Sequence, residues 1–168
     1  MNLGDLGEFG LIHRFAPLFY FNQRPGVEGI GDDCAVIPYQ DGLSFLVTTD
    51  LLIENTHFIK EKITPEDLSY KALAVNLSDI AAMGGKPHYA FLSLGLPIHT
   101  SLAWIDAFFA SFKQLAEQTE VQLLGGDTTR SSQIIINVLL MGVIETSLIK
   151  RRSQAVPGDI ICCTGHLG

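Results

Sequence analysis

The chain has 168 residues, 47% of them hydrophobic and 17% charged, which suits one globular domain with a buried core and argues against a disordered or fibrous chain. Eighteen Asp and Glu residues against eleven Lys and Arg give a net charge of -7, which argues against a sequence-independent grip on nucleic-acid phosphates. We therefore expect metals or small molecules as partners, and no nucleic acid.

The sequence also lacks the signature of a membrane span. No stretch of eighteen apolar residues is free of charges or helix breakers, and the first twenty residues include Asp5, Glu8, His13 and Arg14. A transmembrane helix or a secretory leader needs a longer apolar run. We expect a cytoplasmic protein without membrane contact, whose three cysteines are buried free thiols.

Hydrophobic spacing and turn residues predict alternating helices and strands. A helix over 64–83 is the best defined, because Thr64 and Pro65 form a typical start and Gly84-Gly85 a typical stop. The longest apolar strand, 134–144, is expected at the centre of the sheet or at an interface. The other predicted elements are helices over 6–20 and 101–117 and strands over 35–37, 43–49, 89–96, 121–124 and 159–164.

The end of the chain is unusual. Pro157-Gly158 predicts a turn, and the strand predicted over 159–164 is followed only by a short glycine-rich segment. A strand with no following element indicates a fragment that stops as a second domain begins.

Five aspartates stand out because each lies at the end of a hydrophobic element beside Gly or Thr, or late in a helix. Without them the chain has thirteen acids against eleven bases, so most of the net charge belongs to this set: Asp32, Asp33, Asp50, Asp79 and Asp127. Carboxylate and hydroxyl oxygens favour Mg²⁺ over zinc, and several aspartates around Mg²⁺ usually face a phosphate. No usual nucleotide-binding glycine motif is present.

Each aspartate also has a plainer interpretation. Asp32 and Asp33 follow a glycine loop and could belong to a surface turn, and Asp50, predicted to end a strand, could be a cap. Asp79 argues more strongly, because the end of a helix disfavours an anion. It needs a cation, either Lys71 or another base, or a bound metal.

The motifs together resemble thiamine-monophosphate kinases. They occur in the order of that family and span nearly the whole chain: Gly29-Ile30-Gly31-Asp32-Asp33-Cys34-Ala35-Val36-Ile37, Thr48-Thr49-Asp50, His57-Phe58, Lys71 through Gly84, and Gly125-Gly126-Asp127-Thr128-Thr129. The resemblance implies ATP-dependent phosphorylation of thiamine monophosphate to thiamine diphosphate, with several Mg²⁺ ions and direct in-line transfer.

The resemblance also implies site residues. The metal ligands fall on Asp33, Thr48, Thr49, Asp50, Asp79 and Asp127, with Asp32 as a further candidate; ATP contacts fall on Gly126, Asp127 and Arg152, and the substrate contact on His57. No residue is assigned covalent catalysis. Taken without the family, His57 and Arg152 are ordinary surface residues.

The implied fold is α/β, a mixed sheet with helices on one face that pairs with a second sheet into a barrel across a homodimer. The implied domains are 1–150, for metal, ATP and dimerisation, and 151–168, the start of a truncated C-terminal domain. Two alternatives stay open: another enzyme of the superfamily, such as selenide water dikinase, aminoimidazole ribonucleotide synthetase, formylglycinamidine ribonucleotide synthetase or the hydrogenase-maturation carbamoyl dehydratase, and a non-catalytic metal-binding dimerisation fragment.

Overall fold

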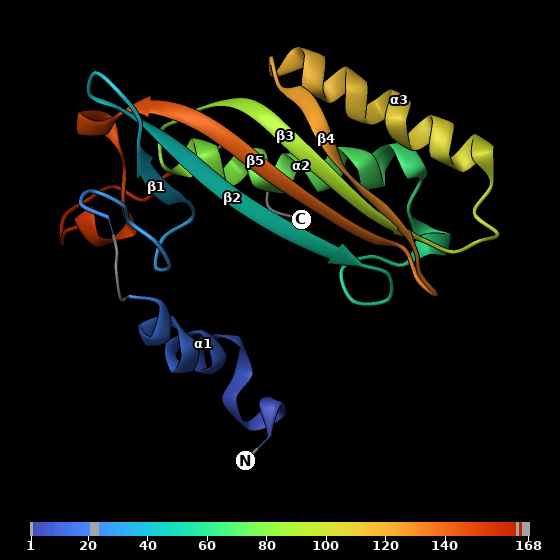
Figure 1. Cartoon of the computed structure of the whole chain (residues 1–168), viewed down its shortest axis with the longest axis horizontal. Coiled ribbons are helices and arrows are strands. Elements are labelled where there is room, and N and C mark those ends of the chain that lie inside the picture. Colours follow the sequence, from blue (N-terminus) through green and yellow to red (C-terminus); the bar gives the residue numbers. More distant parts are fainter. Residues whose placement is uncertain (1, 21–23, 164, 166–168) are drawn as a thin grey trace.

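A computed structural model describes residues 2–20, 24–163 and 165. Its centre is a five-stranded mixed sheet in the order β1-β2-β5-β3-β4 (Figure 1). The α-helices and strands are α1 Leu3–Phe15, β1 Ala35–Pro38, β2 Leu43–Ile53, α2 Pro65–Ala82, β3 Lys86–Leu96, α3 Leu102–Gln118, β4 Gln122–Arg130 and β5 Ile135–Glu145. All pairings are antiparallel except β3 with β4, which is parallel.

The core lies between the sheet and helices α2 and α3, which cover the same face of it. Along β5 the buried and half-buried residues alternate: Ile136, Val138 and Leu140 are buried under the helices, while Leu139 and Met141 lie on the opposite face. The α/β class, with a mixed sheet and helices on one face, and the central place of the apolar strand predicted over 134–144 are therefore confirmed. No helix in the described part of the chain is long and apolar enough to cross a membrane.

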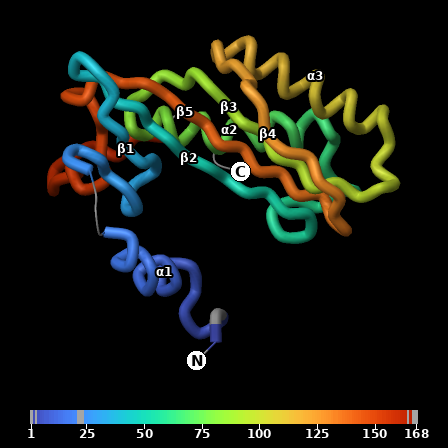
Figure 2. Tube along the Cα trace, in the orientation of Figure 1, coloured from blue at the N-terminus to red at the C-terminus, as the bar shows by residue number. Residues whose placement is uncertain are grey.

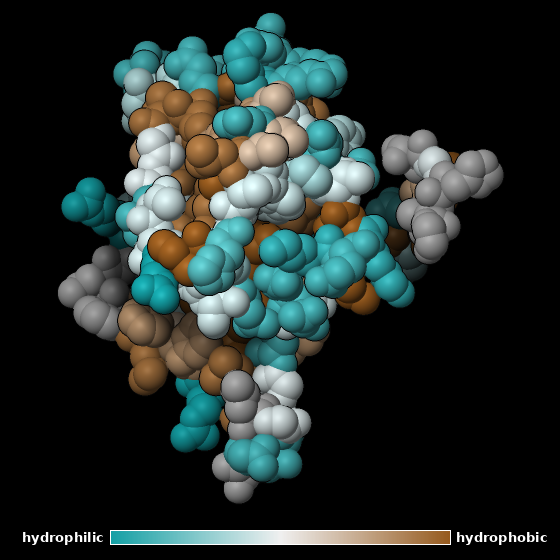
Figure 3. All heavy atoms as spheres, turned by 90° about the vertical axis from the view of Figure 1, so that its right-hand side faces the viewer, coloured by the Kyte–Doolittle hydropathy of each residue, from teal (hydrophilic) through white to brown (hydrophobic). Residues whose placement is uncertain are grey.

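Helix α1 lies away from the sheet (Figure 2). Gly7, at φ 64°, interrupts it, and a 3-10 turn over Ala16–Phe19 continues it. Phe9 is 71% exposed. Figure 3 views the molecule from the right-hand side of Figure 1 and shows apolar patches between polar groups on that face.

Two predicted strands are longer than expected. Strand β2 continues to Ile53, because β5 pairs with it over its full length as far as Ile53 opposite Ile135. Asp50 therefore lies within a strand, not at its end. Strand β4 continues through the whole Gly125–Arg130 motif, because the motif pairs with β3 instead of forming a loop.

The predicted turn at Pro157-Gly158 is present, but the strand predicted over 159–164 is absent where the structure describes it. Residues 159–163 form no strand, and Ile161 is 98% exposed, because no described segment pairs with this run. Thr164 lies outside the described residues. Cys162 and Cys163 are exposed free thiols for the same reason, and Cys34 alone is buried as expected.

Candidate functional site

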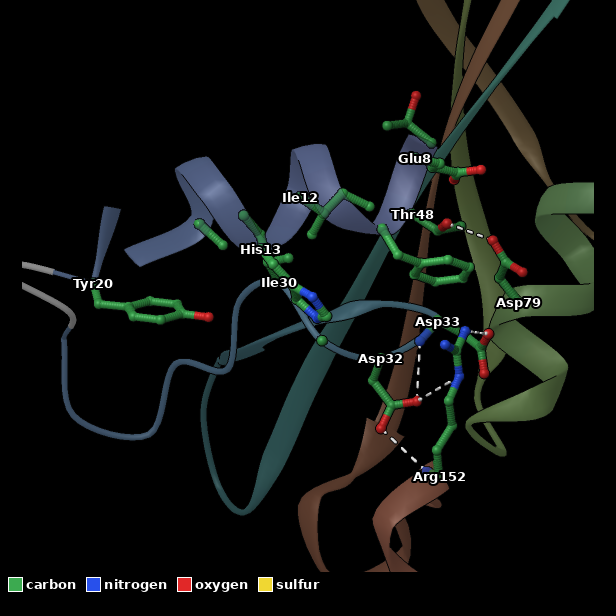
Figure 4. Close-up of a pocket in the computed structure, with 14 residues that line it drawn as sticks. Glu8, Ile12, His13, Tyr20, Ile30, Asp32, Asp33, Thr48, Asp79 and Arg152 are labelled. Atoms are coloured by element: carbon green, nitrogen blue, oxygen red, sulfur yellow. Dashed lines mark hydrogen bonds and ion pairs between the residues drawn. The ribbon is translucent and has the colours of Figure 1, made fainter. Parts of the chain in front are cut away.

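A cavity of about 660 Å³ collects six of the predicted site residues (Figure 4). They come from four separate segments: the glycine loop before β1, strand β2, the last turn of α2 and the segment after β5. These residues are Asp32, Asp33, Thr48, Thr49, Asp79 and Arg152. Apolar side chains of α1, including Phe9 and Ile12, form the opposite wall.

Asp79 reaches the cavity from the last turn of α2, where its only hydrogen-bond donor in the described structure is the Thr48 hydroxyl, at 2.6 Å from Oδ2. Thr48 points toward α2 because β2 alternates its side chains, and Thr48 lies on the helix-covered face. The Lys71 ammonium donates instead to the backbone oxygen of His57 at 2.7 Å. Lys71 was therefore the wrong cation for Asp79. Another base, Arg152, lines the same cavity, and the metal explanation stays a prediction.

Arg152 is the cation nearest the glycine loop. Its guanidinium pairs with the Asp33 carboxylate, and its Nε lies 3.7 Å from Asp32 Oδ1. The backbone N–H of Arg152 also donates to Asp32 Oδ2 at 3.2 Å, and the N–H of Asp33 donates to Asp32 Oδ1 at 3.0 Å. The predicted nucleotide contact and two predicted metal ligands thus lie together.

The acids influence one another electrostatically. Burial raises the pKa of Asp50, Asp79 raises it further, and His57 opposes both effects. Burial, and then Asp79, Asp33 and Asp32, raise the pKa of the Cys34 thiol to about 12. Cys34 is therefore a neutral core residue. Arg152 offsets only part of the charge of the neighbouring aspartates, and a divalent cation would offset more of it.

The oxygen atoms that line the cavity are suitable ligands for a hard cation such as Mg²⁺, but they do not form a complete coordination shell. Carboxylate and hydroxyl oxygens line the cavity, and Mg²⁺ usually takes one or two carboxylates from the protein, with water and phosphate oxygens as its other ligands. Within the described residues, no three His, Cys, Asp or Glu side chains lie close enough together to hold a metal ion by themselves. Further ligands must therefore come from phosphate, water or another chain.

His57 follows β2 and is held in one tautomer. Its Nδ1 accepts a hydrogen bond from the backbone N–H of Ile53 at 3.0 Å. In the neutral imidazole the proton therefore sits on Nε2. His57 can thus donate a hydrogen bond to an anionic ligand from its exposed position.

Asn137 is a site residue that the sequence analysis missed. Its amide donates to the Thr49 hydroxyl at 2.9 Å and to the backbone oxygen of Asp50 at 3.1 Å. It comes from β5, which pairs with β2. An isolated Asn in an apolar strand was the only signal in the sequence, and it does not reveal which neighbour it contacts.

Asp127 and Gly126 lie elsewhere, on the outer strand β4. Across the sheet, Asp127 of β4 is paired with Ser93 of β3, and Ser93 is paired with Asn137 of β5. Asn137 in turn lies opposite Leu51 of β2. Asp127 is therefore three strands away from β2, or roughly 14 Å at ordinary strand spacing. The expectation that one cluster holds all the metal ligands is not met within this chain.

The β4 edge has its own hollow, of about 440 Å³. Gly126 and Asp127 line it together with Phe109 of α3 and leucine side chains. Gly126 has φ 154°, and a Cβ there would lie 1.7 Å from the backbone oxygen of Leu92. Only glycine lets β4 pair with β3 at this point.

Comparison with known proteins identifies the relatives of this arrangement. Residues 31–144 match the family described as AIR synthase related protein, N-terminal domain. The chain belongs to this family. The five strands and the helices α2 and α3 fall within or close to the matched region.

Thiamine-monophosphate kinases are similar to the chain over nearly all of its length. The Bacillus subtilis protein is 38% identical over 164 residues, which cover 97% of this chain and 50% of the relative. The Escherichia coli K12 protein is 40% identical over 162 residues, covering 96% and 49%. The chain thus spans about half the length of these relatives.

A solved structure has the same fold. It is described as AaThiL complexed with AMPPCP and TMP, and it superposes with a TM-score of 0.78 at 36% identity, covering 86% of this chain and 44% of its own. That protein was therefore solved with the two named ligands.

Proposed function

We propose that the chain is the metal- and nucleotide-binding part of a kinase that transfers the γ-phosphoryl group of ATP to thiamine monophosphate. The observation that carries the proposal is the cavity of Asp33, Thr48, Asp79 and Arg152, in a chain 38% identical to a thiamine-monophosphate kinase. The match with that kinase covers 97% of this chain.

The reaction needs positioning more than covalent help. A phosphate oxygen of thiamine monophosphate attacks the γ-phosphorus, the bond to the β-phosphate oxygen breaks, and ADP leaves. The acceptor is already ionised, so no general base is required. Several bound Mg²⁺ ions would neutralise the phosphate oxygens during transfer.

The chain's own groups have distinct roles in this proposal. Asp33, Asp50 and Asp79 hold the cations, with Asp32 beside them and Thr48 and Thr49 as hydroxyl ligands. The Arg152 guanidinium binds nucleotide phosphate, and the Nε2–H of His57 donates to the anionic acceptor. Asn137 fixes Thr49 and the Asp50 backbone from the neighbouring strand.

We propose that a second copy of the chain completes the site with its Asp127. A single ion, with Mg²⁺–oxygen distances near 2.1 Å, cannot join the β2 site to an aspartate on β4, about 14 Å from β2. All nine residues of β4 are exposed, although parallel edges are normally covered. A second copy can cover that edge and the half-buried apolar face of β5 at once.

The exposed area supports an interface of that size. The chain exposes 11431 Å², whereas a compact monomer of its mass exposes about 8100 Å². Helix α1 and the exposed segment 152–163 contribute part of the difference, and the exposed strand β4 contributes another part. Stable homodimers bury about 1000 Å² or more on each subunit, which the excess can supply.

The hollow beside β4 suits the base of the nucleotide. Phe109 is 39% exposed there and offers an aromatic face. The glycine backbone at Gly126 allows close approach. A nucleotide whose base lies in this hollow would carry its phosphates past Asp127 toward the carboxylates of the partner chain.

A chimera tests the activity directly. This chain would replace the matching half of the Bacillus subtilis thiamine-monophosphate kinase, and ADP release would be measured with thiamine monophosphate. We expect turnover that depends on Mg²⁺ and is lost with Asp79→Asn. A folded chimera that binds Mg²⁺ without turnover would overturn the proposal and favour the non-catalytic metal-binding module.

The acceptor distinguishes the other enzymes of the superfamily. The same chimera would be supplied with selenide, a carboxamide or a purine precursor in place of thiamine monophosphate. Stimulation of ADP release by one of these, and not by thiamine monophosphate, would contradict the proposed substrate.

A further inference from the structure

Beside the candidate site, a second arginine ties the segment after β5 to the glycine loop. Arg151 donates from Nε to Glu28 Oε2 at 2.7 Å and from Nη2 to Glu28 Oε1 at 2.5 Å. Two parallel bonds to one carboxylate fix the direction of a guanidinium as well as its place. The pair lowers the pKa of Glu28 and raises that of Arg151, chiefly through these hydrogen bonds.

Glu28 is itself anchored. Its backbone N–H donates to the oxygen of Val36 at 3.0 Å, and the N–H of Val36 donates back at 2.8 Å. Val36 is a buried residue of β1. The backbone of Glu28 is therefore fixed to β1, and its carboxylate holds Arg151 in turn.

The next residue, Arg152, differs from Arg151 in exposure. The Arg151 side chain is 25% exposed and the Arg152 side chain is 61% exposed. The Arg152 side chain pairs with Asp33 and Asp32 (Figure 4). Its backbone directly follows Arg151, whose two hydrogen bonds to Glu28 hold this segment in place. A cation on those carboxylates occupies the place where a divalent metal would bind.

We propose that Glu28 and Arg151 are positioning residues for Arg152. They hold its guanidinium against the Asp33 carboxylate, where it competes with a divalent cation. When nucleotide binds, the guanidinium pairs with the nucleotide phosphate instead and leaves Asp33 to the cation. Metal binding to the nucleotide-free protein is thereby weakened, and metal and nucleotide binding support each other. The competition with the cation stands on the geometry alone, whereas the part played by the nucleotide rests on the proposed function.

The first experiment measures Mg²⁺ binding to the chain without nucleotide, by calorimetric titration. Arg152→Gln should tighten Mg²⁺ binding about twofold to fivefold, the range of an exposed ion pair. The double variant Glu28→Gln/Arg151→Gln removes one positive and one negative charge together, so the local charge does not change. It should still tighten Mg²⁺ binding, by less than Arg152→Gln, because Arg152 is no longer held.

Two further variants separate position from charge. Arg151→Lys keeps the charge but loses the two-bond fork, and it should behave like the double variant. The exchanged pair Glu28→Arg/Arg151→Glu can rebuild the fork and should return Mg²⁺ binding toward the original value. Both changes involve partly exposed side chains, so the fold should survive, which circular dichroism would check.

The second experiment uses the chimera and AMPPCP as the probe. Both Arg152→Gln and the double variant should weaken AMPPCP binding, and the double variant should raise the KM for ATP more than it lowers kcat. Unchanged Mg²⁺ binding in Arg152→Gln would overturn the competition. A double variant that matches the original chain while Arg152→Gln differs would overturn the positioning role. If no variant, nor the original chimera, binds AMPPCP, the proposed function fails and the Mg²⁺ result still decides the competition.

Discussion

The two Asp-Thr motifs of this chain have similar sequences and different surroundings. Thr48-Thr49-Asp50 lies in β2, next to the central strand, where α2 brings Asp79 to it. Asp127-Thr128-Thr129 lies in β4, at the open edge, where every residue is exposed. One motif thus lies beside Asp79 in the cavity, whereas the other lies at an open edge that, in our proposal, a second chain covers.

The largest expected effect is loss of activity from changes in the β2 motif and at Asp79. Asp79→Asn and Asp50→Asn should each reduce ADP release by the chimera at least about 100-fold, as for a group that holds a catalytic metal. Both variants should fold, because each removes a charge that lies near like charges. The control is Asp106→Asn, an exposed residue of α3, which should leave turnover unchanged. Near-normal turnover of either site variant at saturating Mg²⁺ would remove the metal assignment.

The next effect concerns the open edge. Gly126→Ala should destabilise the chain by about 2–4 kcal/mol, or detach β4, because the new Cβ would collide with the Leu92 backbone. Gly125→Ala is the matched control, since its Cβ would be 3.8 Å from Phe91, an ordinary contact. Urea denaturation of both variants measures the difference. Equal stabilities would show that β4 is not held in the described register.

Bound Mg²⁺ should stabilise the folded chain. At Mg²⁺ ten times above its Kd, the melting temperature should rise by about 3–6 °C, since the ion binds only the folded chain. Scanning calorimetry would measure this shift, with NaCl at matched ionic strength as the control. Asp79→Asn should show a smaller shift. No shift in the original chain would contradict a metal site formed within it.

The smallest effect is on pH dependence. The raised pKa of Asp50 means that the folded chain holds this proton more tightly than the unfolded chain does. Stability from this group is therefore present at low pH and is lost as the pH rises above the usual aspartate range, near pH 3.9. In chelator, Asp50→Asn should gain about 1–2 °C in melting temperature over the original chain between pH 4 and pH 7. A gain that shrinks with rising pH would contradict the sign.

The contrast between the two motifs also explains what the sequence could predict. Local signals located α2 closely, because Thr64, Pro65 and Gly84 act within their own segment. The extension of β2 past Asp50 could not be seen, because pairing with Ile135 causes it. Likewise, hydrophobic spacing identifies β4 as a strand but not as the outermost one, so the separation of Asp127 from Asp50 of β2 appears only in the sheet order.

The Arg151–Glu28 pair could not be predicted for the same reason. The two residues are 123 positions apart, and each by itself is an ordinary surface charge. Asp33 and Arg152 could be assigned roles only through the family resemblance. Their direct pairing depends on how the segment after β5 returns to the glycine loop.

Mixing two inactive chimeras tests most directly whether the site is completed by a second chain. One carries Asp79→Asn and the other Asp127→Asn. Light scattering would establish dimers, and co-purification through an affinity tag on one chimera would establish subunit exchange. If each site takes Asp79 from one subunit and Asp127 from the other, half of the dimers are mixed, and each mixed dimer has one intact site. The account predicts recovery of about a quarter of the original ADP release after exchange at equal concentrations. Mixed dimers that stay as inactive as either parent would contradict it and place Asp127 in the same site as Asp79 of its own chain.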